Sequence, residues 1–225
     1  MRILCLSDTH DRHPDPEGLP ACDLLIHAGD ATMRGRPDEA RRFARWLCEA
    51  VEATGAARAA WIPGNHDCYA SGHDLRDIER WRLPDALVVD VLGLRVGATS
   101  ASCWIPEPAW APSGRPVWYG WATAWERAEI FGAIPSGLDI LITHAPPAGC
   151  LSRTVAGVDV GDPELAAALA RLERRPRLHV FGHIHEDAGR LTHPCGAISL
   201  NAAYLDEHYC PAVPTVESWR LVDLA

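Results

Sequence analysis

The 225-residue sequence lacks the signals of several protein classes. Its eight cysteines include no Cys-x-x-Cys pair, which excludes the ligand spacing of a zinc ribbon. No apolar run reaches the ~18 residues that a membrane-spanning helix needs, and the first residues enter a predicted strand without the basic and apolar regions of a secretory leader. We therefore expect a cytoplasmic protein with no membrane partner, whose cysteines are free thiols rather than disulfides.

The sequence also lacks an excess of positive charge. Its 21 basic residues, all of them Arg, stand against 30 Asp and Glu residues, which gives a net charge of −9. An extended surface for duplex nucleic acid is therefore not expected, because neutralisation of backbone phosphates drives such binding. The composition is that of a globular protein, and no linker, repeat or low-complexity segment interrupts it. We expect a single domain over residues 1–225, with no indication of the oligomeric state.

Apolar runs and one helical pattern define the first third of the chain. Residues 2–7, 24–27 and 59–62 predict buried strands. Between the last two strands, Pro37 and the acidic pair that follows it open a helix, whose apolar residues recur at helical spacing until Gly55. A strand, a helix and a strand at this spacing form a βαβ unit, which implies parallel strands.

The rest of the chain mixes strand patterns with one more helix. Residues 87–89 and 94–96 predict antiparallel strands, and further strands are expected at 139–143, 178–181, 197–200 and 219–222. A helix is expected from Pro163 until Pro176, with an apolar stripe of Leu165, Leu169 and Leu172. Residues 99–125 hold five of the nine tryptophans, four prolines and two glycines, and this composition predicts a structured surface loop.

Five predicted strands end in residues that can bind a metal ion. These residues are Asp8 and His10, Asp30, Asn65 and His66, His144, and His183 and His185. Oxygen and imidazole ligands without a thiolate suit Mn, Fe, Zn or Co, whereas an all-oxygen set would suit Mg or Ca. The carboxyl ends of strands in open α/β sheets are also where ligands bind. Even seven ligands would exceed the need of one ion with open positions, so we expect two ions that share Asp30.

Each of these motifs has a simpler explanation when it is taken alone. Asp-x-His is common by chance, Gly64-Asn65-His66 could be only a turn, and His144 before two prolines could merely pack a loop. Together they would require five independent strand ends to collect ligands by accident. We therefore favour a centre of two ions, which can clamp a phosphoryl group and lower the pKa of water towards neutrality.

The order of the five blocks resembles the calcineurin-like metallophosphoesterase superfamily. The blocks are Asp8-x-His10, Gly29-Asp30, Gly64-Asn65-His66-Asp67, His144 and Gly182-His183-x-His185. The flanks at 25–30, 143–147 and 178–186 are similar to the branch of the metallophosphoesterase-domain phosphodiesterases. The resemblance spans nearly the whole chain and is weakest over residues 99–137. Mammalian members of that branch can have Gly at the position of His183, so the His of this chain implies two intact metal sites.

The resemblance implies an α/β fold in which two mixed β-sheets pack as a sandwich with helices on the outer faces. It implies a dinuclear metal-dependent phosphoesterase that hydrolyses a phosphodiester, such as a cyclic nucleotide or a nucleic-acid end, with a metal-bridging hydroxide. One ion would be held by Asp8, His10, Asp30 and His185, and the other by Asp30, Asn65, His144 and His183. His66 would not bind metal and would act as the general acid. The ions would be divalent transition metals, Mn first, with Fe, Zn, Co and Ni as alternatives.

Other functions and roles stay open at this point. The chain could be a phosphomonoesterase or protein phosphatase, or a non-catalytic metal-binding scaffold. Asp67 could orient His66 or be a turn residue, and Arg34 could contact a phosphate or be solvated. The tryptophans of 99–125 could stack a nucleobase of a small nucleotide substrate, or belong to the core or to a dimer surface. His27 and His179 are expected to be buried, hydrogen-bonded histidines rather than ligands.

Overall fold

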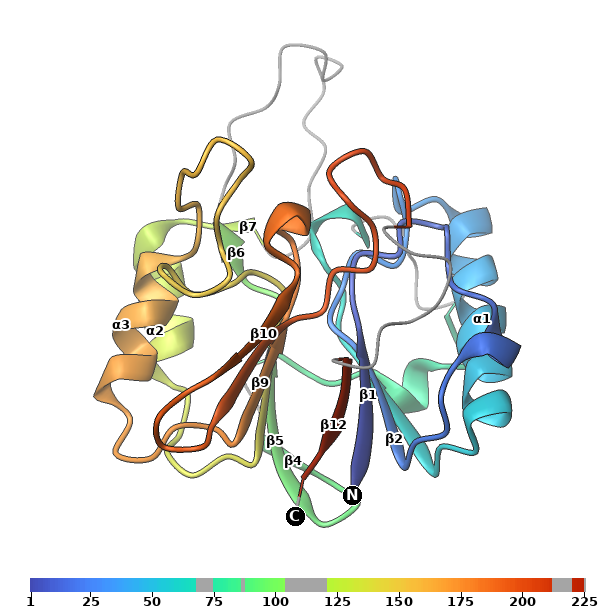
Figure 1. Ribbon diagram of the computed structural model, residues 1–225, viewed down its shortest axis with the longest axis horizontal. Coiled ribbons are helices and arrows are strands. Elements are labelled where there is room, and N and C mark those ends of the chain that lie inside the picture. Colours follow the sequence, from blue (N-terminus) through green and yellow to red (C-terminus); the bar gives the residue numbers. More distant parts are fainter. Residues whose placement is uncertain (68–74, 86–87, 104–120, 212–219, 225) are drawn as a thin grey trace.

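Two β-sheets stand face to face between outer helices (Figure 1). The computed structural model describes residues 1–67, 75–85, 88–103, 121–211 and 220–224. Helix α1 (Pro37–Thr54) covers one sheet, and helices α2 (Ala124–Gly132) and α3 (Pro163–Arg171) cover the other. Short 3₁₀ turns lie at η1 (Pro16–Gly18), η2 (Asn65–Asp67), η3 (Glu79–Trp81) and η4 (His185–Asp187). The expected α/β sandwich of mixed sheets with outer helices is confirmed.

The first sheet has four strands in the order β12-β1-β2-β3. Strands β1 (Arg2–Leu6), β2 (Leu24–His27) and β3 (Arg58–Trp61) are parallel, as the βαβ pattern predicted. Strand β12 (Leu221–Asp223) pairs antiparallel with β1 and brings the two ends of the chain together. The parallel strands place their carboxyl ends at one edge of this sheet.

The second sheet has six strands in the order β10-β11-β9-β8-β5-β4. Its four inner strands are parallel: β5 (Leu94–Thr99), β8 (Ile140–Thr143), β9 (Leu178–Phe181) and β11 (Ile198–Asn201). Strands β4 (Val88–Val91) and β10 (Gly189–Thr192) are antiparallel edges. The antiparallel pair predicted for 87–89 and 94–96 is therefore present as β4 and β5.

Alternate side chains of each strand enter different apolar layers. In β1, Ile3 and Cys5 face the core between the two sheets, whereas Leu4 and Leu6 face the core beneath α1. This follows from the two-residue period of a strand, which sends successive side chains to opposite faces. A third layer packs Leu141 of β8 against α2 and α3. Both faces of the inner strands are buried, which explains their nearly continuous apolar runs.

The two predicted helices are present as α1 and α3, whereas α2 was not predicted. Helix α1 begins at Pro37 and ends at Gly55, whose φ of 68° gives a left-handed C-cap. Helix α3 begins at Pro163 as predicted but ends at Arg171, before the expected stop at Pro176.

The expectation of a loop throughout 99–125 is wrong at both ends of that range. Strands β6 (Ser102–Cys103) and β7 (Trp121–Ala122) form a short parallel pair, and α2 starts at Ala124. The start of α2 has a capping box, in which Thr123 and Glu126 each bond the other's backbone N–H. The Thr-x-x-Glu spacing was the signal that could have located it.

Two expectations on cysteines and membranes can be compared with the described residues. Six cysteines, at positions 5, 22, 48, 150, 195 and 210, are free thiols as expected. Within the described part of the chain, no helix has the length and apolar character needed to cross a membrane. The single domain over residues 1–225 and the cytoplasmic location stay predictions.

A buried ion pair joins α2 and the start of α3. Arg127 Nε lies 2.6 Å from Asp162 Oδ2, and Asp162 is fully buried. The same Asp162 carboxylate accepts the backbone N–H groups of Glu164 and Leu165, so it also caps α3.

Asp162→Ala should therefore lower the free energy of unfolding by about 3–5 kcal/mol, because it leaves the Arg127 charge buried without its partner. Urea unfolding of the metal-free protein measures this change. The matched control is Asp38→Ala, which removes the exposed pair with Arg42 and should leave stability nearly unchanged. Equal effects of the two substitutions would contradict this role of Asp162.

Candidate metal centre

The predicted ligands meet at the edge where the parallel strands of both sheets end. Asp8 and His10 follow β1, Asp30 follows β2, and Asn65 lies in η2 after β3. From the second sheet, His144 follows β8, while His183 and His185 follow β9. In Figure 1 this is the upper edge, opposite the two chain ends. The structure thus brings all seven predicted ligands, and His66, to one region.

The first cluster consists of Asp8, His10 and His185. The Nε2 atoms of the two histidines are 3.2 Å apart. Asp8 Oδ1 lies 3.4 Å from His185 Nε2 and 3.9 Å from His10 Nε2. One imidazole comes from each sheet, so an ion at this point would connect the two sheets.

The second cluster consists of Asp30, His144 and His183. His144 Nε2 lies 3.3 Å from Asp30 Oδ2 and 2.9 Å from Asn65 Oδ1. The same Asp30 Oδ2 atom lies 3.7 Å from His10 Nε2 of the first cluster. Asp30 therefore contacts both clusters through one oxygen, which is the position that a shared ligand requires.

Backbone carbonyls fix the orientation of the histidines. His10 Nδ1 donates to Thr32 O (3.2 Å), His144 Nδ1 to Ala28 O (3.0 Å) and His185 Nδ1 to Asp206 O (2.9 Å). A carbonyl oxygen only accepts, so the proton must be on Nδ1. Each Nε2 atom is thereby directed to the cluster, as in proteins whose metal-ligating histidines are held by outer hydrogen bonds.

The two aspartates are oriented in the same manner. Asp30 Oδ1 accepts the His66 backbone N–H (2.8 Å), and Asp8 Oδ2 accepts the His183 backbone N–H (2.9 Å). Each carboxylate keeps its other oxygen for the cluster. Within the described part of the chain, Asp8 Oδ1 and His183 Nε2 are buried side-chain atoms that accept no hydrogen bond. Buried polar atoms normally have hydrogen-bond partners. These two atoms, a carboxylate oxygen and an imidazole nitrogen, could instead bind a metal ion, and such a set of ligand atoms suits divalent transition metals.

The turns that carry the ligands adopt an uncommon backbone. Asp8, His10, Asp30 and His183 all have φ between 41° and 70°, in the left-handed region that disfavours side chains. A glycine allows the closest approach: a Cβ at position 64 would lie 2.7 Å from His144 Cε1, and one at position 182 would overlap the Asp8 carboxylate. Strain of this kind persists where the surroundings over-determine it, and it clusters at functional sites.

The histidines of each cluster differ in protonation. Burial lowers the pKa of His10 and of His183 to about 4, so both are neutral at pH 7. Burial also opposes protonation of His144 and His185, but the carboxylate beside each ring raises its pKa to about 9. For His144 that carboxylate is Asp30, and for His185 it is Asp8. Each cluster therefore combines one neutral and one protonated imidazole.

His66 lies at the edge of both clusters. Its ring is 4.8 Å from that of His10, and its Nδ1 donates to Met33 O (2.7 Å). His66, His10 and Asp30 also form a third group with metal-binding geometry, so its predicted role as a non-ligand stays a prediction.

Asp67 does not orient the His66 ring, nor is it a surface turn residue. It is buried, and it accepts the backbone N–H groups of Ala31, Thr32 and Gly64 and the Thr32 hydroxyl. Asp67 therefore joins the turn after β2 to the turn after β3. In sequence, an acid next to a histidine gives no indication of which partner it will have.

Other expectations have mixed outcomes. His27 and His179 are buried and contact the hydroxyls of Thr9 and Thr143, so they are hydrogen-bonded core histidines as expected. Arg34 is exposed and does not line the pocket of the clusters. Most of the tryptophan cluster lies outside the described residues; Trp125 is 68% exposed on α2.

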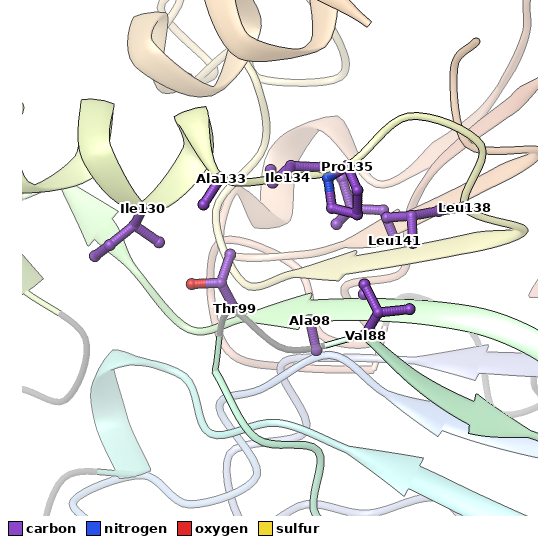
Figure 2. Close-up of a pocket in the computed structure, with 10 residues that line it drawn as sticks. Val88, Ala98, Thr99, Ile130, Ala133, Ile134, Pro135, Leu138 and Leu141 are labelled. Carbon is purple, nitrogen blue, oxygen red and sulfur yellow. The ribbon is translucent and has the colours of Figure 1, made fainter.

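The pocket above the clusters includes a residue that sequence reasoning missed. Tyr209 lines it, with its ring 4.9 Å from that of His10 and 5.1 Å from that of His185. A lone tyrosine in a C-terminal loop carries no motif that could have revealed this. A different pocket, between β5 and the segment after α2, is apolar (Figure 2). None of its described lining residues has a titratable side chain, so these residues offer no comparable chemistry.

Comparisons with known proteins agree with this geometry. The model of the family described as calcineurin-like phosphoesterase matches residues 1–187, a range that includes all predicted ligands and His66. Metallophosphoesterase domain-containing protein 1 of Homo sapiens, like that of Mus musculus, is 32% identical over 96% of this chain and 69% of its own length. A 3′,5′-cyclic-nucleotide phosphodiesterase of Nostoc sp. is 27% identical, over 77% of this chain and 60% of its own length.

Metal binding should release protons, because the protonated His144 and His185 must lose a proton before Nε2 can bind an ion. With pKa values raised to about 9, this release is expected below pH 9 and should fade above it. Each ion should release about one proton, so its apparent affinity should rise about tenfold per pH unit. Calorimetry of Mn²⁺ binding in buffers of different ionisation enthalpy measures the release. Heats that do not depend on the buffer at pH 7.5 would contradict it.

Proposed function

Because the chain belongs to the calcineurin-like phosphoesterase family, whose members carry out metal-dependent phosphoester hydrolysis, we propose that it is a phosphodiesterase with two divalent ions. The observation that carries this proposal is the position of Asp30, which contacts both ligand clusters through one oxygen. Two adjoining sites of this kind suit phosphoryl transfer, in which the attacking and the leaving oxygen both need stabilisation.

We assign the seven ligands to two sites. Asp8, His10, Asp30 and His185 would hold one ion, and Asp30, Asn65, His144 and His183 the other. When bound, the ions would neutralise phosphoryl oxygens and lower the pKa of water towards neutrality. Mn is the expected metal, with Fe, Zn, Co and Ni as alternatives, since the oxygen and imidazole donors suit all of them.

His66 is the proposed general acid. Its Nδ1 proton is held by Met33 O, so Nε2 is the ring atom that can carry a proton to the leaving group. The ring lines the same pocket as His10 and Asp30. An alkoxide leaving group needs such a proton, and a positioned acid contributes about 10²- to 10⁴-fold in rate. In this proposal His66 supplies the proton, while the seven ligands bind the ions.

The proposed substrate is a small phosphodiester, such as a nucleotide. The relative from Nostoc sp. is named for 3′,5′-cyclic nucleotides, which supports this substrate class for the present chain. We keep the expectation that the protein acts in the cytoplasm on a soluble substrate.

Metal counts on two variants test the shared position of Asp30. Asp30→Ala should lose both ions, because it removes a ligand from each site. His10→Ala should lose mainly one ion. Metal analysis of protein reloaded with Mn²⁺ and freed of excess metal gives these counts. Equal counts for the two variants would contradict a shared carboxylate.

Turnover by His66→Ala tests the role of the acid. This variant should keep both ions and lose about 10²- to 10⁴-fold in kcat for diesters with a poor leaving group, because no positioned group protonates the alkoxide. For a bis-aryl phosphate, whose leaving group needs little protonation, the fall in kcat should be smaller. Loss of metal from His66→Ala would instead show that this residue is a ligand. A Mn-loaded wild-type protein that is inert towards mono- and diesters would favour a non-catalytic scaffold.

A further inference from the structure

Two acidic residues that line the candidate metal pocket, Glu186 and Glu207, give it a negatively charged rim. Besides the predicted ligands and His66, the residues that line this pocket include Glu186, Glu207 and Tyr209. Among the described lining residues, none is Arg or Lys. The pocket also contains His183, whose Nε2 is buried without a hydrogen-bond partner, so the rim faces a site that can still accept a ligand.

The rim is attached to the elements that hold His185. Glu186 follows His185 in η4, and Glu207 follows Asp206, whose carbonyl accepts the His185 Nδ1 proton (2.9 Å). The position of both carboxylates is therefore coupled to the first cluster. Both residues are exposed to solvent and line the pocket.

A tight turn presents Tyr209 to the same cluster. Tyr209 N–H donates to Asp206 O (2.9 Å), and Asp206 Oδ1 accepts the backbone N–H groups of His208 (2.9 Å) and Cys210 (2.8 Å). Tyr209 itself has a φ of 58°, an uncommon conformation for an aromatic residue. Its ring stands edge-on to His10 and His185. The turn thus holds one ring against two predicted ligands.

The phenol of Tyr209 is a neutral hydrogen-bond donor. A neutral donor can bond a phosphoryl oxygen without adding charge. Where proteins bind a dianionic phosphate, by contrast, they commonly use the guanidinium of Arg.

We infer that Tyr209, Glu186 and Glu207 make this site selective for singly charged phosphodiesters over doubly charged phosphomonoesters. The inference rests on the proposed function and concerns which substrate the same site takes. A phosphomonoester carries close to two charges above pH 7, because its second pKa is about 6, whereas a diester carries one. Repulsion by the two rim carboxylates is thus about twice as large for the monoester. Repulsion of the wrong substrate is a common source of specificity.

The test compares diester and monoester on the Mn-loaded full-length protein at pH 8. The substrates are bis-(4-nitrophenyl) phosphate and 4-nitrophenyl phosphate. The double variant Glu186→Gln/Glu207→Gln should raise kcat/KM about tenfold for the monoester but only about threefold for the diester, because the diester carries half the charge. The matched control is Glu49→Gln/Glu129→Gln, which removes two exposed carboxylates from the outer helices. The control variant should leave kcat/KM for both substrates unchanged.

Tyr209→Phe separates the hydroxyl from the ring. The variant keeps the contact with His10 and His185, so its metal content should equal that of wild type. KM for the diester should rise about ten- to a hundredfold, the effect of one lost hydrogen bond to a charged group, with a smaller change in kcat. A loss of metal, or no change in KM, would remove Tyr209 from the substrate site.

Binding provides a readout that does not depend on turnover. Calorimetry of the Mn-loaded protein should show that inorganic phosphate binds about tenfold tighter to the double variant than to wild type, whereas dimethyl phosphate binds only about threefold tighter. An unchanged ratio of the two affinities would overturn the inference even if diesters are cleaved. A wild-type protein that cleaves neither substrate would instead overturn the proposed function, and the binding ratio would still decide the charge selectivity.

Discussion

One carboxylate, that of Asp30, stands between the two halves of the candidate site. Its Oδ1 is held by the His66 backbone N–H, and its Oδ2 faces His10 on one side and His144 on the other. The position of this single side chain therefore depends on contacts with three groups that follow three different strands. Gly64 permits this, because any side chain there would occupy the space between Asp30 and His144. The charge of Asp30 also determines the protonation of His144, so geometry and electrostatics depend on the same residue.

The sandwich fold provides the rigidity that such a site needs. The ligand turns hold four residues in left-handed backbone, each at an energetic cost, and they do so directly beyond fully buried strands. Buried parallel strands from both sheets fix where each turn starts. Asp67 then connects the turns after β2 and β3, and the His185–Asp206 bond connects the turn after β9 to the C-terminal segment. The cost of strained turns is offset by an apolar core that lies below them rather than around them.

Much of this arrangement could be predicted from the sequence, for identifiable reasons. Strands such as Leu24–His27 are short apolar runs that stop at a Gly and a polar residue, and these stops are also where the ligands lie. Five strands that each end in a metal-binding residue are improbable by chance, so the sequence indicates that these strand ends meet at one edge of the sheets. Helix α1 was located by its proline, its acidic first turn and its final Gly. In each case the local chemistry and the overall fold favour the same structure.

What could not be predicted depends on contacts between distant segments. The carbonyls of Ala28, Thr32 and Asp206 orient three histidines, yet every residue has a carbonyl and no sequence pattern marks these. Asp67 accepts hydrogen bonds from Ala31 and Thr32, which lie more than thirty residues away from it in the sequence. Helix α3 ends at Arg171 and Leu172 already has an extended backbone, so Pro176 does not mark the end of this helix. Tyr209 reaches the site only because its turn is bonded to Asp206.

The central claim is that two ions bind on either side of Asp30. Anomalous diffraction from crystals of the Mn-loaded protein, measured above and below the Mn absorption edge, tests it most directly. The account predicts two Mn peaks, both in contact with the Asp30 carboxylate, one beside His10 and His185 and the other beside His144 and His183. A single peak, or two peaks of which only one contacts Asp30, would contradict it.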